Sequence, residues 1–282
     1  MATRRCGGLP VSQGLAHRDP LDSRDPFQVF DWYWADGSSE SARSDALRSQ
    51  PAETECLMEM ISADSLLHFA LWAVLGDSHP VGGLWSETQT DLQATIYLAY
   101  GGFFRQALTV LRTWFELVVH AVYFSDHYGQ PTGRYEKWRI GDRNAPAKME
   151  AIAVSLSGRR GKQLNVDADA ILGELQPIYS VLCDQAHGSG LDKYKLQDGR
   201  DNVTRYLEKS FNLWFESLLK CLNAGCFLYR AFFRGELAEY FSRYKSEAAR
   251  LGAVADKLSP KVPHLGKLVE ELLQEASKPV RP

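Results

Sequence analysis

A long run of helical periodicity in the middle of the chain does most to restrict the fold. Apolar residues recur at the spacing of an α-helix from about residue 86 to residue 128, and Ser86 with Gln89 forms the S-x-x-Q pattern of a capping box. An unbroken helix of this length would be about 60 Å long at 1.5 Å per residue. The pair Gly101-Gly102 lies inside the run, where it favours a kink or the close approach of another helix.

Helical spacing also continues on both sides of this run. A first helix is expected from Pro51 to Gly76, and Pro177 predicts a kink, or two consecutive helices, between Asp167 and Gly188. No stretch shows the alternation of a β-strand. We therefore predict an all-α protein, an antiparallel bundle of four to five core helices. The other expected helices cover residues 144–156, 202–251 and 265–276.

The organisation of the chain follows from its composition. Residues 1–50 are rich in Gly, Pro, Ser, Asp and Arg and predict a flexible, partly disordered arm, followed by a bundle domain at 51–251. A linker and an amphipathic helix occupy 252–282. The aromatic residues at 27–34 are the exception within the arm, and either dock on the helical core or anchor a partner.

Charge, cysteine content and hydropathy exclude several classes of protein. The 282 residues hold 32 Lys and Arg against 35 Asp and Glu, so the net charge of -3 excludes a broadly basic nucleic-acid coat. The five Cys form no CxxC pair, which favours free thiols and a cytoplasmic location. The best candidate for a membrane span, residues 107–124, is interrupted by Arg112, Glu116 and His120, so we expect no contact with a membrane.

A narrow polar face crosses the central helical run. At 100° per residue Arg105, Arg112, Glu116, His120 and His127 fall on one side of the helix, with apolar residues on both flanks. We call these five residues the polar seam. The seam is a solvated stripe, a buried ion pair that sets the register between helices, or a functional cleft, and the sequence leaves all three open.

Two further segments carry candidate ligand-binding or catalytic groups. Asp184 and His187 are three residues apart near the end of a predicted helix, where the helix dipole favours a charged imidazole. This end of the bundle has the potential to meet the seam, although a terminal His is also a common capping or surface residue. The segment 129–144 places Trp138 and Arg139 in a basic, aromatic stretch that is either a solvated connecting loop or a contact for nucleic acid.

Three chemistries suit a meeting of these groups. In RNA cleavage, His187 would act as acid or base while Arg112 holds phosphate. A di-iron site needs two Glu-x-x-His motifs, which the spacing from Glu116 to His120 does not provide, so we expect no metal and no cofactor. The third is binding alone. The candidate catalytic residues are His187, Arg112, Glu116 and His120, and the candidate ligand-binding residues are Arg105, Asp184, Tyr179, Trp138 and Arg139.

Several short motifs between residues 95 and 190 resemble HEPN-like all-helical prokaryotic families of the abortive-infection and toxin type. They are Gly-Gly-Phe-Phe-Arg-Gln-Ala-Leu at 101–108, Leu111-Arg112, Glu116, Tyr123-Phe124, Trp138, Tyr179, Leu182 and His187-Gly188. The resemblance implies a helical bundle that is commonly a dimer. It also implies a role as a metal-independent ribonuclease or as an RNA- or protein-binding module in prokaryotic defence.

The sequence departs from the family in one respect. HEPN ribonucleases carry an Arg four to six residues from a His on one helix, and the corresponding positions before His187 hold Ser180, Val181 and Leu182. We therefore expect a HEPN-like binding or scaffold module of a prokaryotic defence or mobile-element system, self-associating and without the usual HEPN catalysis. The alternative is a ribonuclease toxin or defence effector that uses His187. A metal-binding bundle ranks third.

Overall fold

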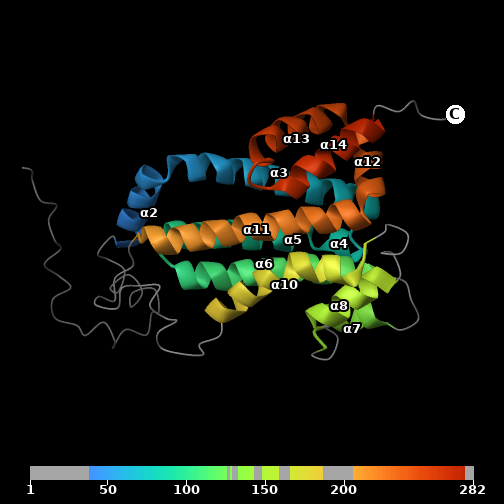
Figure 1. Cartoon of the computed structure of the whole chain (residues 1–282), viewed down its shortest axis with the longest axis horizontal. Helices are drawn as coiled ribbons and strands as arrows, with labels where there is room; N and C mark the ends of the chain where they lie inside the picture. Colours follow the sequence, from blue (N-terminus) through green and yellow to red (C-terminus); the bar gives the residue numbers. More distant parts are fainter. Residues whose placement is uncertain are drawn as a thin grey trace, which may run out of the picture.

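The computed structural model describes residues 38–125, 128, 133–142, 148–158, 166–186 and 206–276, and these residues form an all-α protein. Within them twelve helices are present and no β-strand, which confirms the predicted fold class (Figure 1). The helices are α2 (Ser38–Ser49), α3 (Pro51–Leu75), α4 (Pro80–Gly83), α5 (Trp85–Tyr100), α6 (Phe104–Ser125), α7 (Arg134–Arg139), α8 (Met149–Leu156), α10 (Ala168–Ala186), α11 (Glu208–Phe232), α12 (Arg234–Arg243), α13 (Lys245–Leu258) and α14 (Pro263–Ala276).

Five long helices make the centre of the molecule. Helix α6 packs against α5, α10 and α11, and α3 contacts α5 and α11 (Figure 1). Helices α12, α13 and α14 form a second group that packs on α3 and α11. The predicted division after residue 251 is not a structural boundary, because α13 continues through it and α14 packs on α11, α12 and α13.

The central helical run is a hairpin and not one long rod. Helix α5 ends in a Schellman motif, in which the backbone N–H of Phe103 donates to the carbonyl of Leu98 at 2.8 Å and that of Gly102 to Ala99 at 3.1 Å. Gly102 has φ +83°, a left-handed conformation that glycine adopts without steric cost. The Gly101-Gly102 pair therefore reverses the chain, so that α5 and α6 pack side by side instead of spanning about 60 Å.

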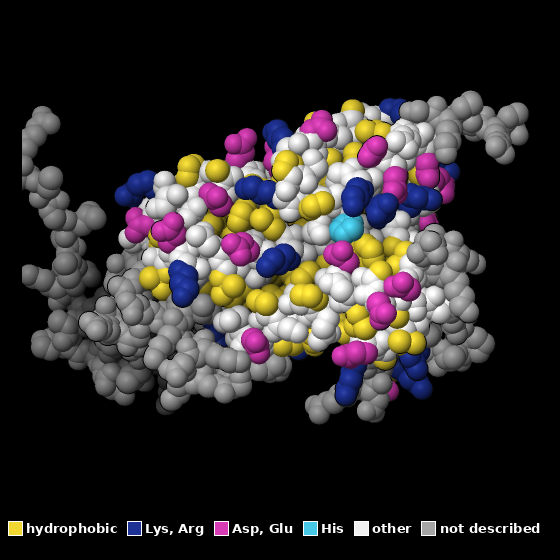
Figure 2. All heavy atoms as spheres, viewed as in Figure 1, with side chains coloured by type: hydrophobic (Ala, Val, Ile, Leu, Met, Phe, Trp, Pro, Cys, Tyr) yellow, Lys and Arg dark blue, Asp and Glu magenta, His cyan; other side chains and the backbone are white. Residues whose placement is uncertain are grey.

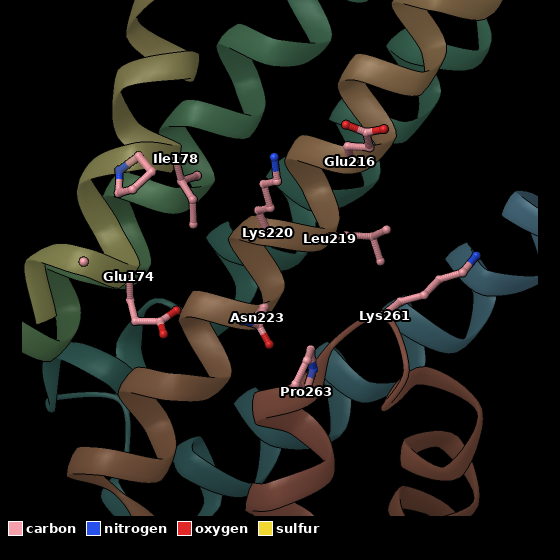
Figure 3. Close-up of a pocket in the computed structure, with 10 residues that line it drawn as sticks. Glu174, Ile178, Glu216, Leu219, Lys220, Asn223, Lys261 and Pro263 are labelled. Carbon is pink, nitrogen blue, oxygen red and sulfur yellow. The ribbon is translucent and has the colours of Figure 1, made fainter. Parts of the chain in front are cut away.

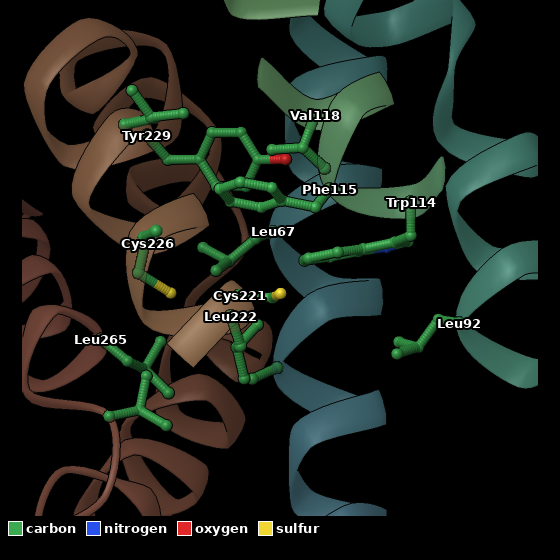
Figure 4. Close-up of a cluster of buried hydrophobic side chains, with 14 of the residues drawn as sticks. Leu67, Leu92, Trp114, Phe115, Val118, Cys221, Leu222, Cys226, Tyr229 and Leu265 are labelled. Carbon is green, nitrogen blue, oxygen red and sulfur yellow. The ribbon is translucent and has the colours of Figure 1, made fainter. Parts of the chain in front are cut away.

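Aromatic side chains from α6 and α11 fill the core between the helices. Trp114 and Trp214 are 1% and 0% exposed, and the Trp214 indole N–H donates to the Thr95 hydroxyl at 2.9 Å, which joins α11 to α5. A Cβ atom placed on Gly225 would lie 3.8 Å from the Trp114 ring, so this glycine is where α11 approaches α6 closely. Figure 4 shows a cluster of buried side chains from this region, including Leu67, Trp114, Phe115, Cys221, Leu222, Tyr229 and Leu265.

The cysteines of the core are free, as the sequence predicts. Cys221 and Cys226 are fully buried, and burial raises the pKa of each thiol because the thiolate would lose its hydration. Cys56 and Cys183 are also free and are partly buried. All four behave as apolar packing residues or weak hydrogen-bonding groups in a reduced protein.

Three segments that we expected to be loops contain helices. Helix α2 lies within the predicted arm, α4 interrupts the predicted loop after α3, and α7 lies within the predicted connector at 129–144. All three are short or polar, so helical periodicity over them is too brief to detect from the sequence. At Pro177, where a kink or two consecutive helices were expected, the chain forms the single helix α10.

The predicted helix over 202–251 is divided at positions other than its glycines. Breaks occur at Phe233 and Tyr244, whereas Gly225 lies within α11 and Gly235 lies in the first turn of α12. The ends predicted for the helices before Gly76 and near Leu156 are confirmed. The aromatic residues at 27–34, Cys6, His127, the predicted helix start at 144–147 and residues 187–190 lie outside the described residues.

Helices α3 and α6 have the length and hydropathy that a membrane-crossing helix needs. At least half of each apolar window is buried against other helices of the fold. Core helices of water-soluble bundles share these properties, so the two helices are only weak evidence for a membrane span. On the face shown in Figure 2, acidic and basic side chains are interspersed over the described helices and do not form a single basic field.

The chain reversal at Gly102 gives a test of the hairpin. Gly102→Ala forces a residue with a Cβ atom into the left-handed region and is expected to lower the free energy of unfolding by about 1 kcal/mol. The matched control is Gly173→Ala in α10, where an added Cβ atom meets no atom within 4 Å. That change is expected to raise the free energy of unfolding by about 0.5 kcal/mol, because alanine stabilises a helix interior. Urea denaturation measures both, and equal effects would contradict the turn geometry.

Candidate functional site

The Arg112–Glu116 part of the polar seam lies on α6 and is partly buried by the helices that cover it. The Arg112 and Glu116 side chains are 20% and 29% exposed, and the Arg112 Nε is 2.9 Å from the Glu116 Oε1. Their spacing of four residues places both on one helix face, one turn apart. This part of the seam is therefore an ion pair at a helix–helix boundary, intermediate between the solvated and the buried arrangements that the sequence allows.

Helix α10 meets the seam through Tyr179. The Arg112 Nη2 donates to the Tyr179 hydroxyl at 3.3 Å, and the Arg112 Cζ lies 5.5 Å from the centre of the Tyr179 ring. Burial raises the pKa of Tyr179 to about 12, and its hydrogen bond with Cys183 and the Glu116 carboxylate act in the same direction. The phenol therefore stays protonated at neutral pH, and the Arg112 guanidinium has both an anionic and an aromatic partner.

A pocket of about 240 Å³ opens beside this ion pair, between α6, α8 and α10. Its chemistry is mixed, because two carboxylates, one ammonium group, an imidazole, an amide and a phenol share it. The Gln176 Oε1 is buried and accepts no hydrogen bond from the residues that the structure describes. We call this the seam pocket, and its lining residues are Glu116, His120, Lys148, Met149, Glu150, Gln176 and Tyr179.

Of the four seam residues that the structure describes, Glu116 and His120 line the seam pocket, and Arg112 joins it through its ion pair with Glu116. Arg105, in the first turn of α6, and Asp184, exposed on α10, are not among the lining residues. Contacts between Arg112 and Tyr179, and a pocket shared by His120 and Gln176, show that α6 and α10 run antiparallel (Figure 1). The described part of α10 therefore ends beside the start of α6, and the next residue, His187, lies outside the described residues.

The basic aromatic segment that contains α7 belongs partly to the core. The Trp138 ring stacks on Phe124 at 4.7 Å with the planes 22° apart, and lies 6.0 Å from the His120 ring. The Arg139 side chain is 62% exposed and its Nε is 2.8 Å from the Glu136 carboxylate. Trp138 thus supports one side of His120, while Arg139 is a surface group with an acidic partner.

A chain of buried polar groups that we did not predict joins α3, α5 and α11. The His68 Nδ1 lies 3.1 Å from the Asp64 Oδ1, the Gln89 amide donates to the Asp64 Oδ2 at 2.5 Å, and the His68 Nε2 is hydrogen-bonded to the Tyr229 hydroxyl. Ser65 donates to the Gln89 Oε1 at 2.6 Å. The sequence signal is an Asp and a His four residues apart in an apolar helix.

The burial of these polar side chains limits the role that they can have. The Asp64 and His68 side chains are 1% and 2% exposed, so a substrate has no access to them. Hydrogen bonds join Ser65 to Gln89, Gln89 to Asp64 and His68 to Tyr229, whereas the His68 Nδ1 lies 3.1 Å from the Asp64 Oδ1 without a hydrogen bond. We infer that the chain sets the register of α3 against α5 and α11.

A second pocket, of about 370 Å³, lies between α10, α11 and the start of α14 (Figure 3). The Asn223 Oδ1 accepts from the backbone N–H of His264 at 2.9 Å and so caps α14, and the His264 Nε2 is 3.0 Å from the Glu174 Oε1. Glu216, Lys220 and Lys261 also line this pocket. Since acidic and basic groups alternate around it, it has no single charge preference.

Among the described residues, no group of three or more His, Cys, Asp or Glu side chains is arranged to hold a metal ion. Comparisons of the chain with protein-family models, with curated proteins and with solved structures find no match.

The buried polar chain predicts a large effect at Asp64. Asp64→Ala leaves the Gln89 amide without its acceptor and removes the carboxylate that lies 3.1 Å from the His68 Nδ1, and it is expected to lower the free energy of unfolding by about 3 kcal/mol. The control is Asp45→Ala, which removes an exposed carboxylate 3.6 Å from Arg48. This change is expected to alter the free energy of unfolding by less than about 0.5 kcal/mol. Chemical denaturation of both variants tests this, and a small effect at Asp64 would show that water reaches the site.

The contact between α6 and α10 is tested by a double-mutant cycle. Arg112→Ala and Tyr179→Phe each remove one partner of the 3.3 Å hydrogen bond, and the coupling free energy is expected to be about 0.5–1 kcal/mol. The unfolding free energies of the two single variants, the double variant and the wild type give this value. Strict additivity would mean that the two helices do not meet at these residues in solution.

Proposed function

We propose that this protein is a HEPN-like helical binding module that acts in the cytoplasm of a prokaryote, in a defence or mobile-element system, without the usual HEPN catalysis. Its partner is a protein surface, and a second copy of the chain is the first candidate. The motifs at 101–108, Arg112, Glu116 and Tyr179 support the family assignment. The single observation that carries the choice of binding over catalysis is the engagement of Arg112.

Arg112 is the residue that a ribonuclease mechanism would use to hold phosphate, and its guanidinium is already occupied. It pairs with Glu116 at 2.9 Å and donates to Tyr179 at 3.3 Å. A phosphate at this position would displace or face the Glu116 carboxylate, which repels it. The arrangement supports a seam that stabilises the helix boundary and presents polar groups to a partner.

The composition of the seam pocket favours a protein partner over RNA. Lys148 is accompanied by Glu116 and Glu150, so the lining carries both signs of charge. An RNA backbone is uniformly negative and is bound by clusters of Lys and Arg. The Gln176 amide offers both a hydrogen-bond donor and an acceptor, which suits the varied polar side chains of a protein surface.

Catalysis is tested directly with RNA. Purified protein and His187→Ala are incubated with tRNA and with total RNA without added metal, and we expect neither to cleave either substrate. Cleavage by the wild type that disappears in His187→Ala would overturn the proposal in favour of a ribonuclease with His187 as acid or base.

Partner binding is tested through self-association. We expect light scattering to show a dimer at micromolar concentration, and Lys148→Glu at the pocket rim to weaken it by about tenfold or more, because the rim then carries three carboxylates. The control is Lys137→Glu on α7, which lies outside the pocket lining and is exposed. Equal effects of the two changes would show that the seam pocket is not the interface.

A further inference from the structure

A third pocket, of about 590 Å³, lies where the end of α3 meets α12 and the start of α13. Four of its eight lining residues are aromatic and two are acidic, and none is basic. The lining residues are Phe69, Trp72, Ala73, Gly76, Asp77, Tyr240, Tyr244 and Glu247, and we call this the aromatic pocket. It is reached from solvent, because Ala73 and Asp77 are exposed and Tyr244 is 51% exposed.

The four rings stand at different angles around the pocket. The planes of Phe69 and Tyr240 are 81° apart with centroids at 6.1 Å, so these two rings form a corner. The ring centroids of Trp72 and Phe69 are 5.3 Å apart with their planes at 43°. Those of Tyr244 and Tyr240 are 4.6 Å apart with their planes at 32°. The four rings line one pocket at several inclinations, as the rings of an aromatic cage do.

The two carboxylates are held by the aromatic residues of the cage. The Trp72 indole N–H donates to the Asp77 Oδ1, and the Tyr240 hydroxyl donates to the Glu247 Oε2 at 3.3 Å. Burial and the neighbouring Glu247 carboxylate raise the pKa of Tyr240 to about 12, so its hydroxyl remains a donor. These bonds fix the acidic groups against the rings.

Among the described residues, neither Asp77 nor Glu247 forms an ion pair with a Lys or Arg. The nearest arginines in the sequence of α12 and α13 have other partners: Arg243 binds Glu239 at 2.6 Å and Arg250 donates to Ser62 at 3.1 Å. The end of α3 adds the negative end of its helix dipole, while Glu247, in the first turn of α13, offsets the positive end of that helix.

We propose that the aromatic pocket binds an organic cation that carries a methylated ammonium group. Such a group is large, weakly hydrated and unable to donate strong hydrogen bonds, so ring faces and nearby carboxylates attract it while no donor is left unsatisfied. An unmethylated ammonium is compact and strongly hydrated, and it would lose that hydration in a cage of rings. The volume of about 590 Å³ also accommodates the rest of the ligand.

Two sources share this chemistry, a free small molecule such as choline and a methylated lysine on a protein. This proposal does not rest on the proposed function, because the seam pocket is lined by α6, α8 and α10 and has no residue in common with the aromatic pocket. Failure of one proposal therefore leaves the other unaffected.

Calorimetric titration of the full-length protein tests the site with matched pairs of probes. Choline is compared with 3,3-dimethyl-1-butanol, its uncharged carbon analogue, and a trimethyllysine peptide is compared with its unmethylated form. We expect one or both methylated cations to bind at least tenfold more tightly than the matched probe. Binding of choline alone would identify a small-molecule ligand, and binding of the peptide alone a modified protein.

Two substitutions at the rim locate the binding without disturbing the core. Tyr244→Leu removes a half-exposed ring and Glu247→Gln removes a charge while keeping an acceptor for Tyr240, and each is expected to weaken binding by about three- to thirtyfold. The controls are Tyr97→Leu, an exposed ring on α5, and Glu270→Gln on α14, which are expected to leave affinity unchanged.

Three results would overturn the proposal. They are no binding of either methylated cation at millimolar concentration, equal affinity for the charged and the matched probes, and equal losses of affinity in the rim variants and their controls. Circular dichroism of each variant verifies that the helical fold is retained, so that lost affinity is assigned to the pocket.

Discussion

The enclosure of α6 by other helices is the constraint on which the structure depends. This helix is apolar around most of its circumference, and Trp114, Phe115 and Val119 are almost completely buried. Removing so much apolar surface from water requires neighbours on several sides, and α5, α10 and α11 provide them. The arrangement of the remaining helices follows, because α8 packs on α10, and α14 packs on α11.

The one polar face of α6 creates the seam pocket as a consequence of this enclosure. Arg112 and Glu116 sit at the boundary where α10 covers the helix, and their ion pair satisfies both charges at partial burial. Tyr179 completes the contact from α10. A seam that is already internally paired is suited to orienting helices and to meeting a protein partner, and it is poorly suited to holding a phosphate.

The aromatic pocket arises at a different boundary, where the helices α12 and α13 fold back on the end of α3. There the break at Tyr244 turns the chain between two helices and places the Tyr240 and Tyr244 rings 4.6 Å apart. The two proposed sites thus occupy separate helix junctions, one with mixed charge and one with negative charge and ring faces. We propose a protein partner for the first and a methylated cation for the second.

Periodicity and composition alone determined the helical class, the limits of α3, the end of α8 and the presence of α14, because each depends on local patterns of apolar and capping residues. They also placed Arg112, Glu116 and His120 on one face. Only tertiary structure decided that Gly101-Gly102 reverses the chain, that Tyr179 is the partner of Arg112, and that His68 reaches Tyr229, 161 residues away. Those contacts join distant segments, so their geometry depends on how whole helices pack, which no local pattern encodes.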